Sequence, residues 1–207
     1  MIVLMSAFLL LSAFSCGGGN KANSTSEQSE ETAVNIPQFD ADSAYLYVKN
    51  QVDFGPRVPN TKEHVACGNY LAGKLEAFGA KVTNQYADLI AYNGTLLKAR
   101  NIIGSYKPES KKRIALFAHW DTRPWADNDP DEKNHNTPIL GANDGASGVG
   151  ALLEIARLVN QQQPELGIDI ILLDAEDYGA PQFYTGQHKE EFWCLGSQYW
   201  ARNPHVQ

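Results

Sequence analysis

The sequence contains no long run of basic residues, no internal repeat and no two cysteines near each other. Its 24 acidic residues outnumber 17 basic ones and give a formal net charge of −7, so the chain lacks the positive surface that nucleic-acid binding requires. The missing repeat excludes solenoid, collagen and coiled-coil folds. Without a Cys-x-x-Cys motif, a thiolate metal site is also disfavoured. The content of 43% hydrophobic and 20% charged residues is typical of a globular domain.

The first 15 residues carry no charge and are mostly apolar. They are too few for a membrane-spanning helix, which needs about 20 apolar residues, but they match the apolar core of a secretory signal. Cys16 follows small residues and precedes three glycines, which resembles a bacterial lipoprotein processing site. We therefore expect a signal peptide over 1–15 and a lipid on Cys16. The protein is then an exported lipoprotein of the cell envelope, on its periplasmic or surface face.

Residues 16–38 are polar and rich in Ser, Asn and Glu, which predicts a flexible tether between the membrane and a domain over 39–207. That domain holds two more cysteines, Cys67 and Cys194. In an oxidising compartment they form a disulfide, or they are two small buried residues. The sequence leaves both alternatives open.

Helical and strand-like patterns alternate through this domain. Apolar residues at helical spacing predict three helices, which begin near Asp40, Lys62 and Ala146, with Asp42 as a candidate cap of the first. Apolar runs predict strands over 101–106, 114–118 and 167–173, and residues 121–140 are predicted as a long polar loop. The order strand, helix, strand implies a parallel crossover. We therefore predict an α/β fold, a three-layer αβα sandwich around a mostly parallel twisted sheet.

A histidine and an aspartate follow the predicted strand 114–118. Side chains two positions apart on an extended chain point the same way, so Asp121 and His119 are expected on one side. In that position, Asp121 orients the His119 ring, as carboxylates do for histidines that bind metals.

Acidic residues also follow the other predicted elements. Asp144 stands where a helix is expected to begin, and capping that helix is its alternative role. Asp174, Glu176 and Asp177 crowd the end of the strand 167–173. In open α/β sheets, ligands bind at the carboxyl ends of the strands, so these positions form a candidate site.

No Lys or Arg stands within these three clusters. Carboxylates held within a few ångströms repel one another unless a cation neutralises them. A divalent metal is the simplest such cation, and ligation by oxygen and imidazole suits zinc. Solvated carboxylates in ordinary turns are the alternative.

The segments 117–121, 141–148 and 173–177 resemble, in this order, the zinc signatures of the M28 metallopeptidase superfamily. Within that superfamily the sequence is most similar to secreted glutaminyl cyclases and their bacterial relatives. The likeness runs from about Asp40 to the end of the sequence. It implies a zinc-exopeptidase-like fold that binds the N-termini of peptides or proteins.

The resemblance implies a role for each matching residue. Asp144 and Asp177 match zinc ligands, and Glu176 matches the general base. His119 matches the ligand of a second zinc in the dinuclear peptidases. One Zn²⁺ is expected for a cyclase and two for an aminopeptidase.

In the family, a further acidic residue and a final zinc-ligating histidine lie well downstream of the Glu-Asp pair. His188 and His205 fit no such pattern, so we expect the final histidine ligand to be absent from this chain and the domain to be incomplete at its C-terminus. Three tryptophans either line a substrate pocket or pack in the interior: Trp120, Trp125 and Trp193.

Three functional hypotheses follow. The first is a zinc-dependent glutaminyl-peptide cyclotransferase, which converts N-terminal Gln to pyroglutamate and releases ammonia, with Glu176 moving the proton. The second is a dinuclear aminopeptidase, in which Glu176 activates a water molecule. The third is a surface lipoprotein that binds peptides or metal without turnover.

Overall fold

The computed structural model describes residues 35–206. The chain divides into two units, Met1–Asn35 and Ile36–Gln207, and the fold described below is that of the second. The predicted signal peptide, Cys16 and the tether up to residue 34 lie outside the described residues. Within 35–206, no helix is both long enough and apolar enough to cross a bilayer.

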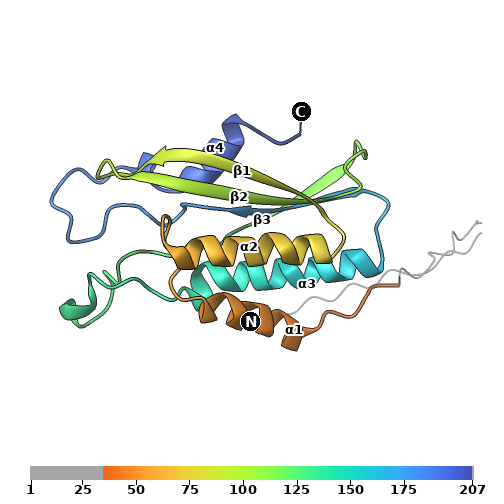
Figure 1. Ribbon diagram of the computed structural model, residues 1–207, viewed down its shortest axis with the longest axis horizontal. Coiled ribbons are helices and arrows are strands. Elements are labelled where there is room, and N and C mark those ends of the chain that lie inside the picture. Colours follow the sequence, from red (N-terminus) through yellow and green to blue (C-terminus); the bar gives the residue numbers. More distant parts are fainter. Residues whose placement is uncertain (1–34, 207) are drawn as a thin grey trace, which may run out of the picture. The chain divides into compact units, whose positions relative to one another are not determined.

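One mixed sheet forms the centre of the domain, with the strand order β1-β2-β4-β3 (Figure 1). Strands β1 (Lys81–Ile90) and β2 (Leu96–Tyr106) form an antiparallel hairpin, and β2 is also antiparallel to β4 (Gly167–Leu173). Strand β3 (Arg113–His119) runs parallel to β4. Every residue of β4 is buried, which explains the continuous apolar run that predicted this strand.

The predicted α/β class is confirmed, but the prediction of a mostly parallel sheet does not match residues 35–206. Two of the three strand pairings there are antiparallel. The antiparallel pairing of β1 with β2 follows from the tight turn that joins them, with Gly94 at φ 83°. Strand β1 was not predicted at all. It alternates between exposed and half-buried residues and lacks the apolar run on which strand prediction depended.

Helices α1 (Ala41–Asp53), α2 (Lys62–Ala77) and α3 (Gly148–Gln161) lie on one side of the sheet, and α4 (Leu195–Arg202) lies on the other (Figure 1). Fully buried apolar side chains of the helices and strands form the main core, among them Leu71, Leu75, Leu153, Ile170 and Leu172. Burying one such side chain stabilises the fold by roughly 1.5–3 kcal/mol relative to leaving it in water.

Side-chain caps set where the first two helices begin. Asp40, not the predicted Asp42, caps α1, since its carboxylate accepts the backbone N–H groups of Asp42 and Ser43. Thr61 caps α2 by accepting the N–H of His64 at 3.2 Å. Gly79, at φ 79°, lies just after the end of α2.

The parallel pair β3–β4 places two chain segments at one edge of the sheet. His119 is the register partner of Leu173, so the residues after both strands leave from the same edge. A loop over residues 120–140, which contains only the short helical turn Glu132–Asn134, and the segment 174–194 extend from there. The predicted long polar loop is thus confirmed.

Candidate active site

His119, the last residue of β3, contacts two carboxylates. Its Nε2 lies 2.9 Å from Asp144 Oδ1, and its Nδ1 lies 3.4 Å from Asp121 Oδ1. Nδ1 is buried and has no hydrogen-bond partner of acceptable geometry. Although burial alone would lower it, the charges of Asp121 and Glu176 and the hydrogen bond with Asp144 raise the pKa of His119 to about 9. The structure therefore brings together the first two predicted clusters.

Asp144 lies in a kinked helical turn, Ala142–Ser147, that precedes α3. It does not cap α3, since that helix begins at Gly148 and has no side-chain cap, so the alternative role is not adopted. The next residue, Gly145, has φ 93°, and a Cβ there would lie 2.8 Å from the carbonyl oxygen of Asp121. This close approach requires glycine and leaves the Asp144 carboxylate free to face His119.

Asp121 joins the two strand ends. Its carboxylate is fully buried, and its two oxygens accept the backbone N–H groups of Glu176 and Asp177, each at 3.1 Å. The sequence predicted Asp121 only as a partner of the His119 ring. The structure gives it a second task, because the same carboxylate fixes the turn that carries both later acidic residues.

The two carboxyl groups of that turn hold protons more tightly than ordinary carboxyl groups. Burial raises the pKa of Glu176 and raises that of Asp177 to about 7. The negative charges of Asp121 and Asp144 act in the same direction on both groups. Such crowding is the electrostatic condition under which a bound cation is stabilised.

Arg123 is a site residue that the sequence clusters did not reveal. Its guanidinium forms a two-point contact with Asp127, at 2.7 and 2.5 Å, and lies 3.4 Å from Asp177 Oδ1. The rings of Trp125 and Trp193 lie 5.6 and 4.8 Å from it. A cation from the loop after β3 therefore does lie against the acidic clusters. The i, i+4 spacing of Arg123 and Asp127 was the only signal for it in the sequence.

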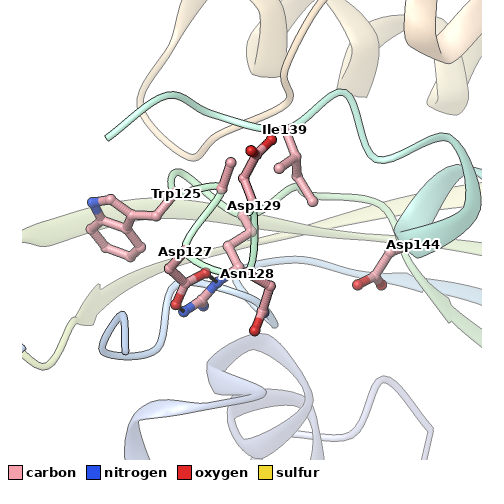
Figure 2. Close-up of a pocket in the computed structure, with 8 residues that line it drawn as sticks. Trp125, Asp127, Asn128, Asp129, Ile139 and Asp144 are labelled. Carbon is pink, nitrogen blue, oxygen red and sulfur yellow. Dashed lines mark hydrogen bonds and ion pairs between the residues drawn. The ribbon is translucent and has the colours of Figure 1, made fainter. Parts of the chain in front are cut away.

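Two cavities open beside these residues. One, of about 270 Å³, has Trp125 and Asp144 on its wall, separated by the loop residues Asp127 to Asp129 (Figure 2). The other, of about 330 Å³, is lined by Asp144 and Asp177 together with Trp193. Of the three tryptophans considered from sequence, Trp125 and Trp193 line these two cavities. Trp120 is fully buried, packs in the core and borders a separate cavity beside His64.

Of the two histidines that fit no family pattern, His188 lies beside the site and His205 does not. His188 lines the larger cavity with Asp144 and Asp177, and its Nε2 is 3.0 Å from the Tyr184 carbonyl oxygen. His205 instead lies 3.3 Å from Asp169, in the middle of β4.

Cys67 and Cys194 are both free, so the disulfide alternative is not adopted. Burial raises the pKa of Cys67 to about 12, so it is a thiol that packs as a small apolar residue.

The donor set at this edge suits a divalent cation in its chemistry. One imidazole and several carboxylates converge, and the buried Asp121 orients both the ring and the acidic turn. Among the described residues, no three His, Cys, Asp or Glu side chains already surround a common point at metal-binding distance. The residues present therefore fit part of a zinc site.

Comparison with known proteins gives consistent matches. The model of peptidase family M28 matches residues 101–207. Glutaminyl cyclase of Bacteroides thetaiotaomicron is 94% identical, with a TM-score of 0.83 over 84% of this chain and 59% of that chain. A leucine aminopeptidase precursor from Bacteroides thetaiotaomicron VPI-5482 is also 94% identical, with a TM-score of 0.83 over 84% and 60%. A Zn-dependent exopeptidase from Parabacteroides distasonis is 63% identical, with a TM-score of 0.82 over 83% and 59%. The chain thus spans about 60% of the length of these solved relatives.

Proposed function

Because the chain belongs to peptidase family M28, we propose that it forms the zinc-binding part of a glutaminyl-peptide cyclotransferase. Such an enzyme converts the N-terminal glutamine of a peptide to pyroglutamate and releases ammonia. The observation that carries the proposal is the meeting of His119, Asp144, Glu176 and Asp177 at one sheet edge, in a chain 94% identical to a solved glutaminyl cyclase.

We propose that Asp144 and Asp177 are ligands of the zinc ion. When bound, zinc supplies Lewis-acid polarisation of the substrate γ-carbonyl. A cyclase needs one such ion. Asp121 keeps Asp177 in place through its backbone N–H, and Arg123 contacts its carboxylate.

Glu176 is the residue that moves the proton in this proposal. The free α-amine of the substrate attacks the γ-carbonyl carbon of the same residue, so the reaction uses proximity and needs no protein nucleophile. Glu176 accepts the proton that the amine loses and delivers it to the departing ammonia. Burial raises the pKa of this carboxyl group, which favours both halves of that task.

The cavities beside the site provide room for the peptide N-terminus. Trp125 and Trp193 supply flat apolar walls, and Arg123 between them is already paired with Asp127. The guanidinium therefore packs against both tryptophan rings and contacts Asp177. It does not present an unpaired charge to the substrate. A neutral glutamine side chain suits such a wall better than an acidic one.

A dinuclear aminopeptidase is the second candidate. The observation that favours it is the 2.9 Å contact of His119 with Asp144, since this pair would complete a second metal position, and one solved relative at 94% identity is named a leucine aminopeptidase precursor. There, Glu176 would accept a proton from the attacking water. The non-catalytic hypothesis is not favoured, because the solved relatives carry the names of enzymes.

Two further statements about the whole protein are proposals. One is a three-layer αβα sandwich. The other is export as a lipoprotein, with removal of residues 1–15 and attachment of a lipid to Cys16 at the cell envelope. Growth with a labelled fatty acid tests the second, because label should enter the native protein and not a Cys16→Ser variant.

Mass spectrometry of two peptides, one starting with Gln and one with Leu, tests the activity. Each is incubated with the zinc-loaded protein at its full natural length, with Glu176→Gln as the control variant. We expect loss of one ammonia from the Gln peptide and no change in the Leu peptide. Release of the first residue of the Leu peptide would establish the aminopeptidase instead. No change in either peptide would refute both activities.

A further inference from the structure

His64 lies in the first turn of α2, outside the segments that carry the acidic cluster, yet it contacts two of those segments. Its side chain is 3% exposed. Its Nε2 is 2.9 Å from both carboxylate oxygens of Asp174, and its ring stacks on Trp120 with 4.3 Å between ring centroids and 18° between ring planes. The proposed mechanism uses none of these three residues.

Asp174 is the fully buried residue that follows β4. Besides His64, its carboxylate accepts the N–H of Arg100 at 2.6 Å and that of Ala175 at 2.7 Å. The two backbone N–H groups can only donate, and we assign the hydrogen of His64 to Nε2, so that all three groups donate to the Asp174 carboxylate. Ala175 has φ 52°, a conformation that is uncommon for a residue with a Cβ, and Glu176 follows it directly. The Asp174 carboxylate thus holds the amide of a bent residue next to the proposed base.

Trp120 stands between His119 and Asp121 and is fully buried. Its indole Nε1 donates to the Arg100 carbonyl oxygen at 3.1 Å. On the α2 side, a Cβ at Gly68 would lie only 3.0 Å from the ring, so the helix backbone packs closely against the indole. The ring of His64 stacks on this indole, so a shift of Trp120 would disturb its neighbours on both sides.

We propose that His64 is a positioning residue that sets the Glu176 turn against the end of β3. Its Nε2 holds the Asp174 carboxylate, which in turn holds the backbone that leads to Glu176. Its ring face packs on Trp120 and so holds the two neighbours of Trp120 in the chain, His119 and Asp121. The catalytic consequence rests on the proposed function. In that reaction, losing the contact with Asp174 misplaces the base without altering the two cavities that Asp144 lines, so kcat falls more than KM rises.

Two substitutions separate the two contacts of His64. His64→Phe keeps a ring on Trp120 and removes the donor to Asp174, whereas His64→Gln keeps a donor of similar reach and removes the stack. Tyr70→Phe is the matched control, because it removes a 3.0 Å hydrogen bond between α2 and Asn50 without touching Asp174. If His64→Phe does not fold, His64→Asn replaces it, since this amide is one methylene too short to reach Asp174.

Amide hydrogen exchange is the first measurement, since it needs no turnover. The amides of Glu176 and Asp177 report on the turn, and those of Ile170 and Ile171 inside β4 report on global opening. We expect His64→Phe to speed exchange at the turn roughly tenfold more than at β4, since a hydrogen bond to a charged group is lost. His64→Gln should stay near the native pattern, and Tyr70→Phe should change both sites alike.

Steady-state kinetics on a Gln-initiated peptide at saturating zinc is the second measurement. We expect His64→Phe to lower kcat roughly tenfold with little change in KM, and His64→Gln to rescue it. Equal exchange at the turn and at β4 in His64→Phe, or equal kcat in His64→Phe and Tyr70→Phe, would overturn the proposal. If native protein shows no turnover while the exchange difference is present, the proposed function fails and the positioning role stands.

Discussion

Removal of the Asp169 charge tests how the sheet that carries the site is stabilised, far from any metal chemistry. Asp169 lies in β4 with its side chain 3% exposed. It accepts hydrogen bonds from Arg113 Nε and Nη2, at 2.7 and 2.6 Å, and from Ser105 Oγ at 2.6 Å. These hydrogen bonds therefore connect β4 to both of its neighbours, to β3 through Arg113 and to β2 through Ser105.

The substitution Asp169→Asn should destabilise the protein by about 3 kcal/mol, because it leaves the Arg113 charge without its partner. We take the lower end of the usual range since the Arg113 side chain keeps 13% of its exposure. The matched control is Asp88→Asn, which breaks the surface pair of Asp88 with Lys98, whose side chains are 60% and 64% exposed. That change should cost less than about 1 kcal/mol.

The effect of Asp169→Asn should also depend on pH. Burial alone would raise the pKa of Asp169, but the hydrogen bonds from Arg113 and Ser105 lower it below its ordinary value. A lowered pKa means that the pair stabilises the fold fully above the unfolded-state pKa of about 3.9 and that this contribution is lost as pH falls through the folded-state pKa. The difference between native protein and the Asn variant should therefore shrink below about pH 4.

Urea unfolding followed by tryptophan fluorescence measures both effects, at pH 7 and at pH 3. The reasoning is refuted if Asp169→Asn costs no more than Asp88→Asn at pH 7, or if its cost is as large at pH 3 as at pH 7.

Three further predictions concern the site itself. Glu176→Gln should abolish turnover of a Gln-initiated peptide while zinc content by elemental analysis is retained, whereas Asp144→Ala should lose both; near-native activity of the first variant would show that the base is wrongly assigned. Arg123→Lys should weaken zinc binding about tenfold in a chelator competition. Lysine cannot reproduce the planar two-point contact with Asp127 that holds the guanidinium beside Asp177. Unchanged zinc affinity would contradict that role. Asp121→Asn should destabilise the protein by about 2 kcal/mol in urea, since the amide NH₂ faces one of two backbone N–H groups and leaves it unpaired; a loss under about 0.5 kcal/mol would contradict this.

Continuous apolar runs predicted the strands β3 and β4, although Ile114 and Phe117 of β3 are exposed. The run 167–173 matches β4 because every residue of that strand is buried. Strand β1 escaped prediction, since hairpin pairing with β2 and not its own apolar content makes it a strand. The sequence predicted the three acidic clusters from their positions after these elements.

Contacts within the site were predictable only where they are local in sequence. The pairing of His119 with Asp121 follows from the geometry of an extended chain. The hydrogen bonds that the amides of Glu176 and Asp177 donate to Asp121 depend on the register of β3 against β4, which no single segment encodes. The contacts of Arg123 with Asp177 and of His64 with Asp174 were missed for the same reason, because each spans more than 50 residues of sequence.

The double attachment of Asp121 has a consequence for engineering this protein. The segments that line the two cavities, residues 123–139 and 180–193, begin only after the chain has been fixed by that carboxylate. Replacing loop sequence beyond those points changes the walls of the cavities while the reactive groups stay anchored to the sheet. Libraries randomised at wall positions such as Asn128 and Gln182, with the Arg123–Asp127 pair retained, should therefore yield folded variants with altered peptide preference.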